Sequence, residues 1–407
     1  MSGIRKLDIT SVEEILNAAS QNDILGTLID ESPEKPWETE QRTILSKNDF
    51  PDTLDVIRSN MLYIPKVGMS ANAQNQIKRL AAFKNPDFYK AQAMRLPIYD
   101  KPRIICTADM TESYIGIPRG CEMALCDMLT DKVNELKMVD RTNFGEIIPV
   151  EFNGKLRDEQ EIAANELLKY SIGVLSATTA FGKTVVASHI ISQRKTNTLI
   201  LVHTQALMQQ WKKSLEQFLK FDIMPPETQK GRGRKKTWSP VGMIGAGKDT
   251  LNGIVDIAVM QSLVDGDEVR ELVRNYGMII VDECHHVSAV NFEKILKYAN
   301  AKYVYGLTAT PARQDGHHPI IFMQCGPIRY RVDAKTQAEK RSFEHYLIPR
   351  FTSFRNISDD NITTLYKKLS EDTARNDSII NDAVLAVKNH RTPIILTERR
   401  EHVAKLT

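Results

Sequence analysis

The chain has 407 residues, 42% of them hydrophobic and 26% charged, which is typical of a globular protein with two or three domains and excludes a disordered or collagen-like chain. Its 54 basic and 51 acidic residues leave a net charge of +3, so a nucleic-acid partner has to be argued from local basic patches. No apolar run is long enough to span a membrane, no signal-peptide core follows Met1, and the five scattered cysteines are typical of a reducing compartment. We therefore expect a cytoplasmic protein with no membrane partner and no zinc site.

The first 145 residues mix helical and extended patterns. Residues 1–50 have the pattern of an acidic helical segment that ends near two prolines, Pro33 and Pro36. Residues 51–145 combine both patterns, which predicts a small α+β accessory domain. Its expected elements are a helix at 71–83, a short strand at 103–106, a turn at 116–120 and helical spacing through 123–129.

From residue 146 to residue 335, β-branched apolar runs alternate with helical patterns. This alternation predicts an α/β domain with a buried parallel sheet and helices on both faces. The expected strands are 173–177, 198–202, 255–259, 278–281 and 303–307, with helices at 183–193, from Leu207 to Phe218, through Val269 and Leu272, and around Phe292 and Leu296. Ligands of such sheets bind beyond the carboxyl ends of the strands, so functional residues are expected directly after each strand.

A P-loop pattern follows the first of these strands. The pattern G-x-x-x-x-G-K-[ST] wraps backbone N–H groups around phosphate oxygens at the start of a helix. Lys183 is expected to reach the β- and γ-phosphates of ATP, and Thr184 to offer its hydroxyl to Mg²⁺. A chance match at a helix start is the weaker alternative, and the similar run from Gly245 to Lys248 lacks the following Ser or Thr, so we interpret it as a plain loop. The predicted nucleotide-binding residues are Ala177, which replaces the usual glycine, Thr178, Thr179, Ala180, Phe181, Gly182, Lys183 and Thr184.

A second acidic motif ends the strand 278–281. Asp282 is expected to hold Mg²⁺, and Glu283 to position the water that attacks the γ-phosphate. A helix-capping Asp-Glu pair is the plainer alternative. Cys284 and His285 stand beside this pair, but the chain has no second pair of ligands at zinc spacing.

These motifs together resemble the DEAD/DEAH-type superfamily 2 helicases, in the XPB-like and type III restriction enzyme branch. Residues 177–184, 282–285 and 308–311 match helicase motifs I, II and III in order, and residues from about Asn60 to Lys335 are also similar to the helicase part of bacterial conflict-system primase–helicases. The resemblance covers about two-thirds of the chain. It departs from the family at Thr178, where a proline is usual. It implies a RecA-like P-loop NTPase fold and ATP hydrolysis with Mg²⁺, coupled to binding of the DNA or RNA backbone, with DNA favoured over RNA.

The resemblance also assigns roles outside motifs I and II. Arg157 and Gln160 match the Q-motif-like element that touches adenine, and His285 is placed with the catalytic residues, although a hydrogen-bonded core histidine is nearly as good an interpretation. The residues expected to couple hydrolysis to movement are Thr308, Ala309 and Thr310. Those expected to grip the nucleic-acid backbone, at motifs Ia and Ib, are His203, Thr204, Gln205, Gln261 and Ser262.

A basic, glycine-punctuated run lies between motifs Ia and Ib. Such a run can track phosphates, and a solvated surface loop is the competing interpretation. Its charged residues, predicted to contact nucleic acid, are Arg232, Arg234, Lys235 and Lys236. Residues 313–318, which follow motif III, are a weaker candidate for contact with DNA.

The last segment, residues 336–407, has the pattern of a linker followed by the opening strand of a second RecA-like domain at 393–397. Motifs V and VI, which carry arginine fingers in the family, are missing from the sequence, so we expect weak or no turnover by the isolated chain. A second RecA-like domain or chain in trans would then complete the site. The alternative function is a nucleotide-binding nucleic-acid clamp or scaffold module without motor activity of its own.

Overall fold

The computed structural model describes residues 45–224, 238–245, 247–284, 289–309, 316, 318–332, 348–355 and 361–406. The chain divides into two compact units, residues 1–339 and 340–407. The predicted helical segment at 1–44 lies outside the described residues, and the proposed boundaries at residues 51 and 146 both fall inside the first unit, so they stay predictions. None of the helices in the described ranges is long and apolar enough to cross a membrane.

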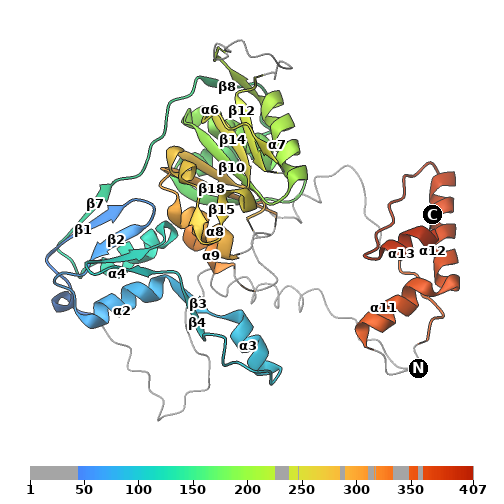
Figure 1. Ribbon diagram of the computed structural model, residues 1–407, viewed down its shortest axis with the longest axis horizontal. Helices are drawn as coiled ribbons and strands as arrows, with labels where there is room; N and C mark the ends of the chain where they lie inside the picture. Colours follow the sequence, from blue (N-terminus) through green and yellow to red (C-terminus); the bar gives the residue numbers. More distant parts are fainter. Residues whose placement is uncertain are drawn as a thin grey trace. The chain divides into compact units, whose positions relative to one another are not determined.

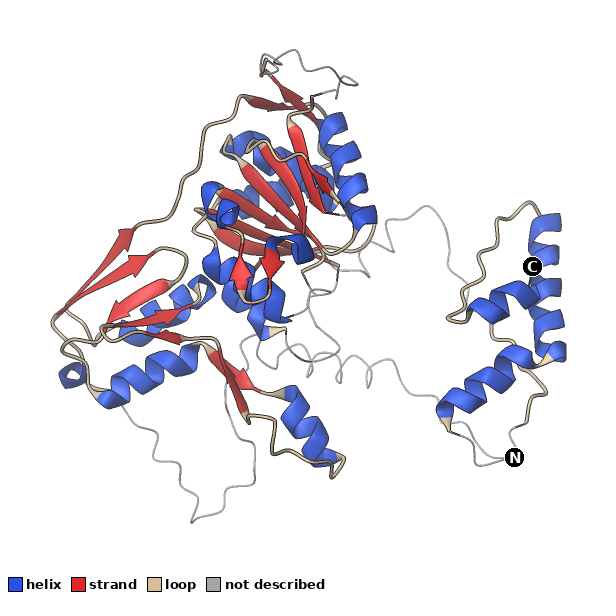
Figure 2. Ribbon diagram, viewed as in Figure 1, coloured by secondary structure: helices blue, strands red, loops and turns tan. Residues whose placement is uncertain are grey.

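A small α+β domain forms the first part of unit 1, as predicted (Figures 1 and 2). Its five-stranded sheet has the order β5-β6-β2-β1-β7, with β1 parallel to β7 and the other pairs antiparallel. Leu54, Val56 and Ile64 are fully buried, because alternate residues of β1 and β2 face the helices. The elements are η1 (Lys47–Asp49), β1 (Thr53–Arg58), β2 (Leu62–Pro65), α2 (Ala71–Leu80), β5 (Asp109–Met110), β6 (Tyr114–Ile117), η2 (Arg119–Cys121), α4 (Glu122–Leu129) and β7 (Glu135–Asp140).

Residues 82–106, which we call the arm, extend from this domain as an antiparallel ribbon carrying one helix (Figure 1). Strand β3 (Ala82–Lys84) pairs with β4 (Ile104–Cys106), which confirms the strand expected at 103–106, and α3 (Pro86–Ala93) lies between them. The predicted turn at 116–120 is wrong in its first half, because Gly116 pairs with Tyr63 inside the sheet. A Cβ at Gly116 would lie 3.3 Å from the Tyr63 ring, so the glycine there makes room for an aromatic neighbour.

The second part of unit 1 is the predicted α/β domain. Its eight-stranded sheet has the order β13-β12-β14-β10-β17-β18-β9-β19 and is parallel except for the edge strand β13. The strands are β9 (Ile172–Ser176), β10 (Thr198–Val202), β12 (Val241–Gly245), β13 (Lys248–Asp249), β14 (Val255–Val259), β17 (Met278–Val281), β18 (Tyr303–Thr308) and β19 (Ile328–Arg331). The helices are α5 (Asp158–Leu168), α6 (Lys183–Arg194), α7 (Gln205–Phe218), α8 (Ala289–Tyr298) and α9 (Pro319–Cys325), and β8 (Val150–Phe152) pairs with β11 (Leu219–Phe221) outside the main sheet.

The two faces of this sheet carry separate cores. Ile200 and Val202 face the side covered by α5, α6 and α7, whereas Leu199 and Leu201 face the side covered by α8 and α9. This alternation explains why β10 is apolar from Leu199 to Val202: a parallel strand is buried on both faces. The core on the α8–α9 side is continuous with that of the small domain. The small domain is therefore packed onto one face of the α/β domain.

One predicted helix of this domain is wrong. The segment after β14 forms η3 (Met260–Leu263), a tight hairpin of β15 (Val264–Asp265) and β16 (Glu268–Val269), and η4 (Glu271–Asn275) instead of a helix through Val269 and Leu272. Gly266 has a φ of 59°, a left-handed conformation that a turn between Asp265 and Asp267 requires. Gly245 and Lys248, the two ends of the run expected to be a plain loop, pair with each other as the ends of the antiparallel strands β12 and β13.

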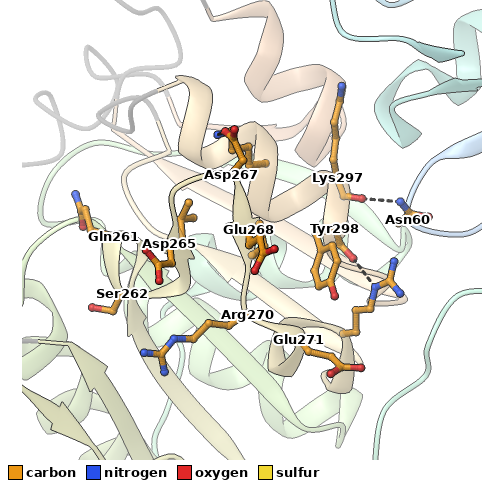
Figure 3. A pocket seen from close by; sticks show the side chains of 14 residues that line it. Asn60, Gln261, Ser262, Asp265, Asp267, Glu268, Arg270, Glu271, Lys297 and Tyr298 are labelled. Atoms are coloured by element: carbon orange, nitrogen blue, oxygen red, sulfur yellow. Dashed lines mark hydrogen bonds and ion pairs between the residues drawn. The ribbon is translucent and has the colours of Figure 1, made fainter.

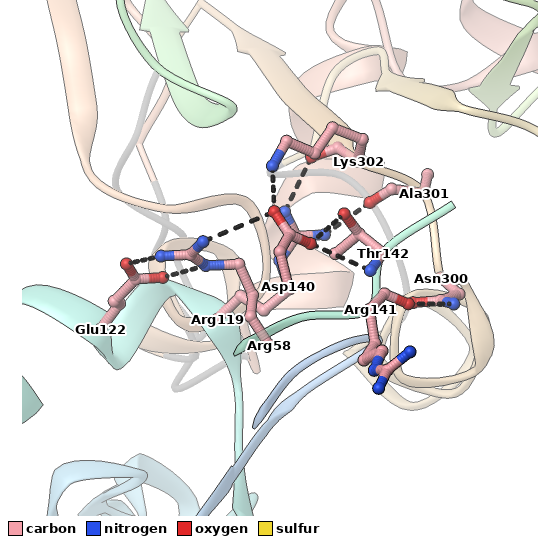
Figure 4. Close-up of polar contacts among 9 residues, drawn as sticks. All are labelled: Arg58, Arg119, Glu122, Asp140, Arg141, Thr142, Asn300, Ala301 and Lys302. Atoms are coloured by element: carbon pink, nitrogen blue, oxygen red, sulfur yellow. Dashed lines mark hydrogen bonds and ion pairs between the residues drawn. The ribbon is translucent and has the colours of Figure 1, made fainter. Parts of the chain in front are cut away.

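Charged groups fix the small domain to the start of β18 (Figure 4). The Arg119 side chain, 4% exposed, donates hydrogen bonds of 2.5 and 2.8 Å to the carbonyl oxygens of Ala301 and Lys302. Lys302 pairs with Asp140. Burial raises the pKa of Asp140, but the contacts from Lys302 and Thr142 outweigh burial and hold this pKa well below its usual range. Burial lowers the pKa of Arg119 to about 10, so its guanidinium stays charged at neutral pH.

Unit 2 is helical in the ranges that the structure describes. It contains α11 (Ile362–Glu371), α12 (Thr373–Lys388) and α13 (Arg400–Leu406). The strand predicted at 393–397 is wrong, because no neighbouring strand in residues 348–355 and 361–406 is there to pair with it. Thr397 instead bonds to the ring of His402, which also bonds to Asn376 and ties α13 to α12.

Replacing Arg119 by methionine should weaken the junction between the two parts of unit 1. The two backbone carbonyls would lose charged donors, so we expect the free energy of unfolding to fall by about 3 kcal/mol. Urea unfolding followed by circular dichroism measures this. Arg141→Met, an exposed site on the same connection, is the control, and equal losses for the two variants would contradict the role given to Arg119.

Candidate nucleotide site

The predicted site residues gather at one edge of the sheet. Strands β9, β10, β14, β17 and β18 are mutually parallel, so their carboxyl ends all reach the same edge. The P-loop follows β9, the Asp-Glu pair follows β17, and Thr308 ends β18 between them. His285 and Thr310 lie outside the described residues, as do the basic residues 232–236 and residues 313–315.

The P-loop links β9 to α6 through a backbone that only some residues can adopt. Ala180 has a φ of 71° and Gly182 a φ of 89°, both in the left-handed region. A Cβ at Gly182 would lie 2.4 Å from the side-chain nitrogen of Gln160, so glycine is required there. Helix α6 then begins at Lys183, and its free N–H groups face the loop. This is the arrangement that binds phosphate.

The Q-motif-like residues hold the P-loop from behind. Gln160, 4% exposed, donates a 2.7 Å hydrogen bond to the carbonyl oxygen of Phe181 and accepts one of 3.0 Å from the backbone N–H of Arg157. The Arg157 guanidinium donates to the same Phe181 carbonyl. In this structure the two residues therefore brace the loop, and their predicted contact with adenine stays a prediction.

An ion pair joins the P-loop to the acidic motif. The Lys183 ammonium lies 3.2 Å from Oε1 of Glu283 and donates a 3.2 Å hydrogen bond to the carbonyl oxygen of Ala177. The two side chains are only 10% and 20% exposed. The phosphate-binding lysine and the water-positioning carboxylate predicted from the sequence thus face each other across the sheet edge.

Asp282 lies deeper, at 6% exposure. Its Oδ2 accepts a 2.6 Å hydrogen bond from the Trp211 indole N–H, and its Oδ1 accepts one of 3.0 Å from the backbone N–H of Glu283. Burial raises the pKa of Asp282 above its ordinary value, and the Trp211 bond opposes this rise. From the sequence, Trp211 is only one position of the helix expected from Leu207 to Phe218. The available signal was chemical, because a buried indole N–H needs an acceptor.

The donor set fits magnesium. Among the described residues no three His, Cys, Asp or Glu side chains form a metal cluster. Mg²⁺ keeps several waters and binds through one or two protein oxygens plus phosphates, which is what Thr184 and Asp282 could offer. Cys284 is a poor metal ligand at neutral pH, because burial raises the pKa of its thiol to about 12 and a thiolate is needed to bind a metal.

Strand β18 connects the two motifs through its backbone. The N–H of Ala177 donates to the carbonyl oxygen of Thr308 at 2.9 Å, and the N–H of Cys284 donates to that of Leu307 at 3.1 Å. Thr308 is fully buried. The end of β18, Leu307 and Thr308, therefore contacts the loop after β9 and the motif after β17 at once.

The predicted nucleic-acid residues of motifs Ia and Ib follow the neighbouring strands β10 and β14. His203 and Thr204 precede α7, and the Thr204 hydroxyl caps it by accepting from the N–H of Leu207 at 3.3 Å. Gln205 and Gln261 are exposed, and Ser262 is half-buried. These groups lie together along the sheet edge, away from the P-loop.

Gln261 and Ser262 also line a pocket of about 1020 Å³ beside the sheet edge (Figure 3). Asn60 of the small domain closes one side of it, and its side-chain amide donates a 2.5 Å hydrogen bond to the Lys297 carbonyl. Acidic and basic side chains make up most of the rest of the lining. They are Asp265, Asp267, Glu268, Arg270, Glu271, Arg274, Lys294 and Lys297.

The parallel sheet, the P-loop after β9 and the Asp-Glu pair after β17 define a RecA-like P-loop NTPase fold. Residues 153–313 match the family described as type III restriction enzyme, res subunit. The DNA 3'-5' translocase XPB2 of Sulfurisphaera tokodaii is 32% identical over 217 residues, 53% of this chain and 45% of the relative. The DNA 3'-5' helicase XPB of Mycobacterium tuberculosis is 29% identical over 193 residues, which are 46% of this chain and 32% of the relative.

Among solved structures, the UvsW helicase from bacteriophage T4 is similar, with a TM-score of 0.48 and 14% identity over 68% of this chain and 99% of that chain. Residues 153–313, less than half of the chain, are thus similar to superfamily 2 helicases of the branch that contains XPB and the type III restriction subunit. The chain spans about half the length of curated relatives that it matches.

Trp211→Phe should move the acid limb of ATP hydrolysis to higher pH. The indole hydrogen bond lowers the pKa of Asp282, so its loss leaves burial unopposed and the carboxylate needs a higher pH to ionise. The pH dependence of kcat/KM measures the shift, with Trp238→Phe as the control. An acid limb at the same pH in a folded Trp211→Phe protein would show that this bond does not tune Asp282.

Proposed function

We propose that this chain is the ATP-hydrolysing part of a nucleic-acid translocase or helicase that acts on DNA. The observation that carries the proposal is the 3.2 Å contact between Lys183 and Glu283. A phosphate-binding lysine and a carboxylate that can orient water, facing each other at the end of a parallel sheet, suit hydrolysis of a nucleoside triphosphate.

Each residue of the site then has a separate task. Lys183 leaves Glu283 and binds the β- and γ-phosphates of ATP, while Glu283, once released, orients and polarises the attacking water. Thr184 and Asp282 hold Mg²⁺, which neutralises phosphate charge when it is bound. Binding of ATP thus exchanges one ion pair for another, so the site need not leave the ammonium buried without a partner.

Coupling to the track runs through β18. Because Thr308 and Leu307 accept hydrogen bonds from both nucleotide motifs, a small movement of either motif is passed to this strand. The residues after β10 and β14 on the same edge then contact the backbone of DNA. DNA is favoured over RNA because the relatives described above are named for DNA translocation or unwinding.

A complete motor also needs a cation from elsewhere to stabilise charge in the transition state. We propose that a second RecA-like domain, in this chain or in a partner chain, supplies it. The alternative, a nucleotide-dependent clamp, predicts tight binding of Mg²⁺–ATP without turnover on any nucleic acid.

Two substitutions test the proposal by steady-state ATP hydrolysis and by binding of a fluorescent ATP analogue. Lys183→Ala should lose both binding and hydrolysis, because the phosphates lose their ammonium. Glu283→Gln should bind the nucleotide normally and hydrolyse it at least about 100-fold more slowly, the usual contribution of a positioned base.

The matched controls come from an exposed Lys–Glu pair of the same domain, Lys169 and Glu166. Lys169→Ala and Glu166→Gln should leave both properties unchanged. The assays are run without nucleic acid and with single- and double-stranded DNA and RNA. Normal hydrolysis by Glu283→Gln would refute the role given to that carboxylate, and stimulation by RNA but not by DNA would refute the assigned track.

A further inference from the structure

The arm, residues 82–106, carries a charge excess that the nucleotide site does not use. It holds five basic and two acidic residues, an excess of +3, which equals the formal net charge of the whole 407-residue chain. The rest of the sequence is therefore balanced, and the arm is a local basic patch of the kind that nucleic acids attract. The basic residues are Lys84, Lys90, Arg95, Lys101 and Arg103.

Most of these charges point into solvent. Lys90 and Arg95 are exposed, and within the described ranges no carboxylate lies close enough to form an ion pair with either. Lys84 and Arg103 lie over the rings of Tyr89 and Phe88, each 5.9 Å from the ring centroid. Within the part of the chain that the structure describes, Lys101 alone among the five has an acidic partner, Asp100, at 3.1 Å. Four of the five cations thus remain available to phosphates.

Large apolar side chains are exposed among these cations. Tyr99 is 91% exposed, and Met94 and Leu96 are 58% and 55% exposed. All three lie in the segment that returns from α3 to β4, next to Arg95 and Lys101 in the sequence. An exposed aromatic ring between basic residues suits stacking on an unpaired base, which single-stranded nucleic acid offers and a duplex does not.

The arm is held firmly at its base. Asn85 is 5% exposed, and its side-chain amide donates a 2.8 Å hydrogen bond to the Pro102 carbonyl. The backbone N–H of Asn85 donates a second hydrogen bond, of 2.9 Å, to the carbonyl oxygen of Arg103. Pro86, at the start of α3, also lies close to Gly316: a Cβ added to Gly316 would lie 2.7 Å from the Pro86 ring. Gly316 comes eight residues after Thr308, so the base of the arm touches the segment that leaves the carboxyl edge of the sheet.

We propose that the arm is a second nucleic-acid contact that binds single-stranded nucleic acid, with Lys90 and Arg95 on the phosphates and Tyr99 stacked on a base. This inference rests on the proposed function, because it gives the motor a contact outside the residues after β10 and β14.

Fluorescence anisotropy of the full chain with a labelled oligodeoxythymidine, in the absence of ATP and over a range of salt, tests the arm. The Lys90→Gln/Arg95→Gln double variant should bind about tenfold more weakly at low salt. The slope of log K against log salt should also become shallower by about 1.4, since each phosphate contact to a single strand contributes about 0.7. Tyr99→Ala should weaken binding about tenfold with little change in slope.

Lys137→Gln, a half-exposed lysine on β7 of the same domain that is paired with Glu135, is the matched control and should bind like the parent chain. Equal losses in the control, or unchanged binding by the double variant, would overturn the proposal. An unaffected Tyr99→Ala protein, or a greater loss with a duplex of equal length than with the single strand, would overturn the single-strand assignment. So would binding of acidic polyglutamate at the arm as tight as that of the oligonucleotide.

The proposed function fails in a different way from this inference. A chain that binds the oligonucleotide through the arm but hydrolyses no ATP on any nucleic acid would refute the motor and leave the arm contact standing. Normal DNA-stimulated hydrolysis, with oligonucleotide binding that the arm variants do not alter, would refute the arm contact alone.

Discussion

The parallel pairing of β9, β18, β17, β10 and β14 is the constraint on which the rest of the structure depends. Parallel strands need crossover connections, so each strand enters the sheet from the same end and leaves at the same edge. Lys183 and Glu283, which are 100 positions apart in the chain, therefore meet at 3.2 Å. The apolar strands are thus as necessary to the site as its charged groups, because they determine where each loop begins.

The site is built at an energetic cost that the fold offsets. Ala180 and Glu283 have φ values of 71° and 45°, a left-handed conformation that costs about 1–3 kcal/mol at each such residue. Asp282 is buried against its preference for water, and the Trp211 indole hydrogen bond offsets part of that penalty. Strain and burial gathered at one sheet edge are typical of a functional site. The small domain is attached at the other end of β18, where Arg119 holds the residues that lead into the strand.

The sequence predicted the parts of the structure that local patterns determine. The strands around the P-loop, the helix that begins at Lys183 and the position of the Asp-Glu pair are all confirmed. The segment around Val269 forms a hairpin instead of the expected helix. The turn at Asp265–Gly266–Asp267 overrides the helical spacing of the apolar residues around it. The strand at 393–397 failed because pairing depends on a distant partner. The Trp211–Asp282 bond and the Arg119 junction also join residues far apart in the sequence, which no local pattern encodes.

When ATP binds, the Lys183 ammonium should leave Glu283 and contact the phosphates instead. A crystal structure of the full chain with Mg²⁺ and a non-hydrolysable ATP analogue tests it most directly. The account predicts phosphate oxygens within hydrogen-bond distance of the Lys183 ammonium and of the N–H groups that open α6, with the Lys183–Glu283 contact broken. A nucleotide bound elsewhere, or bound while that ion pair stays intact, would contradict the account.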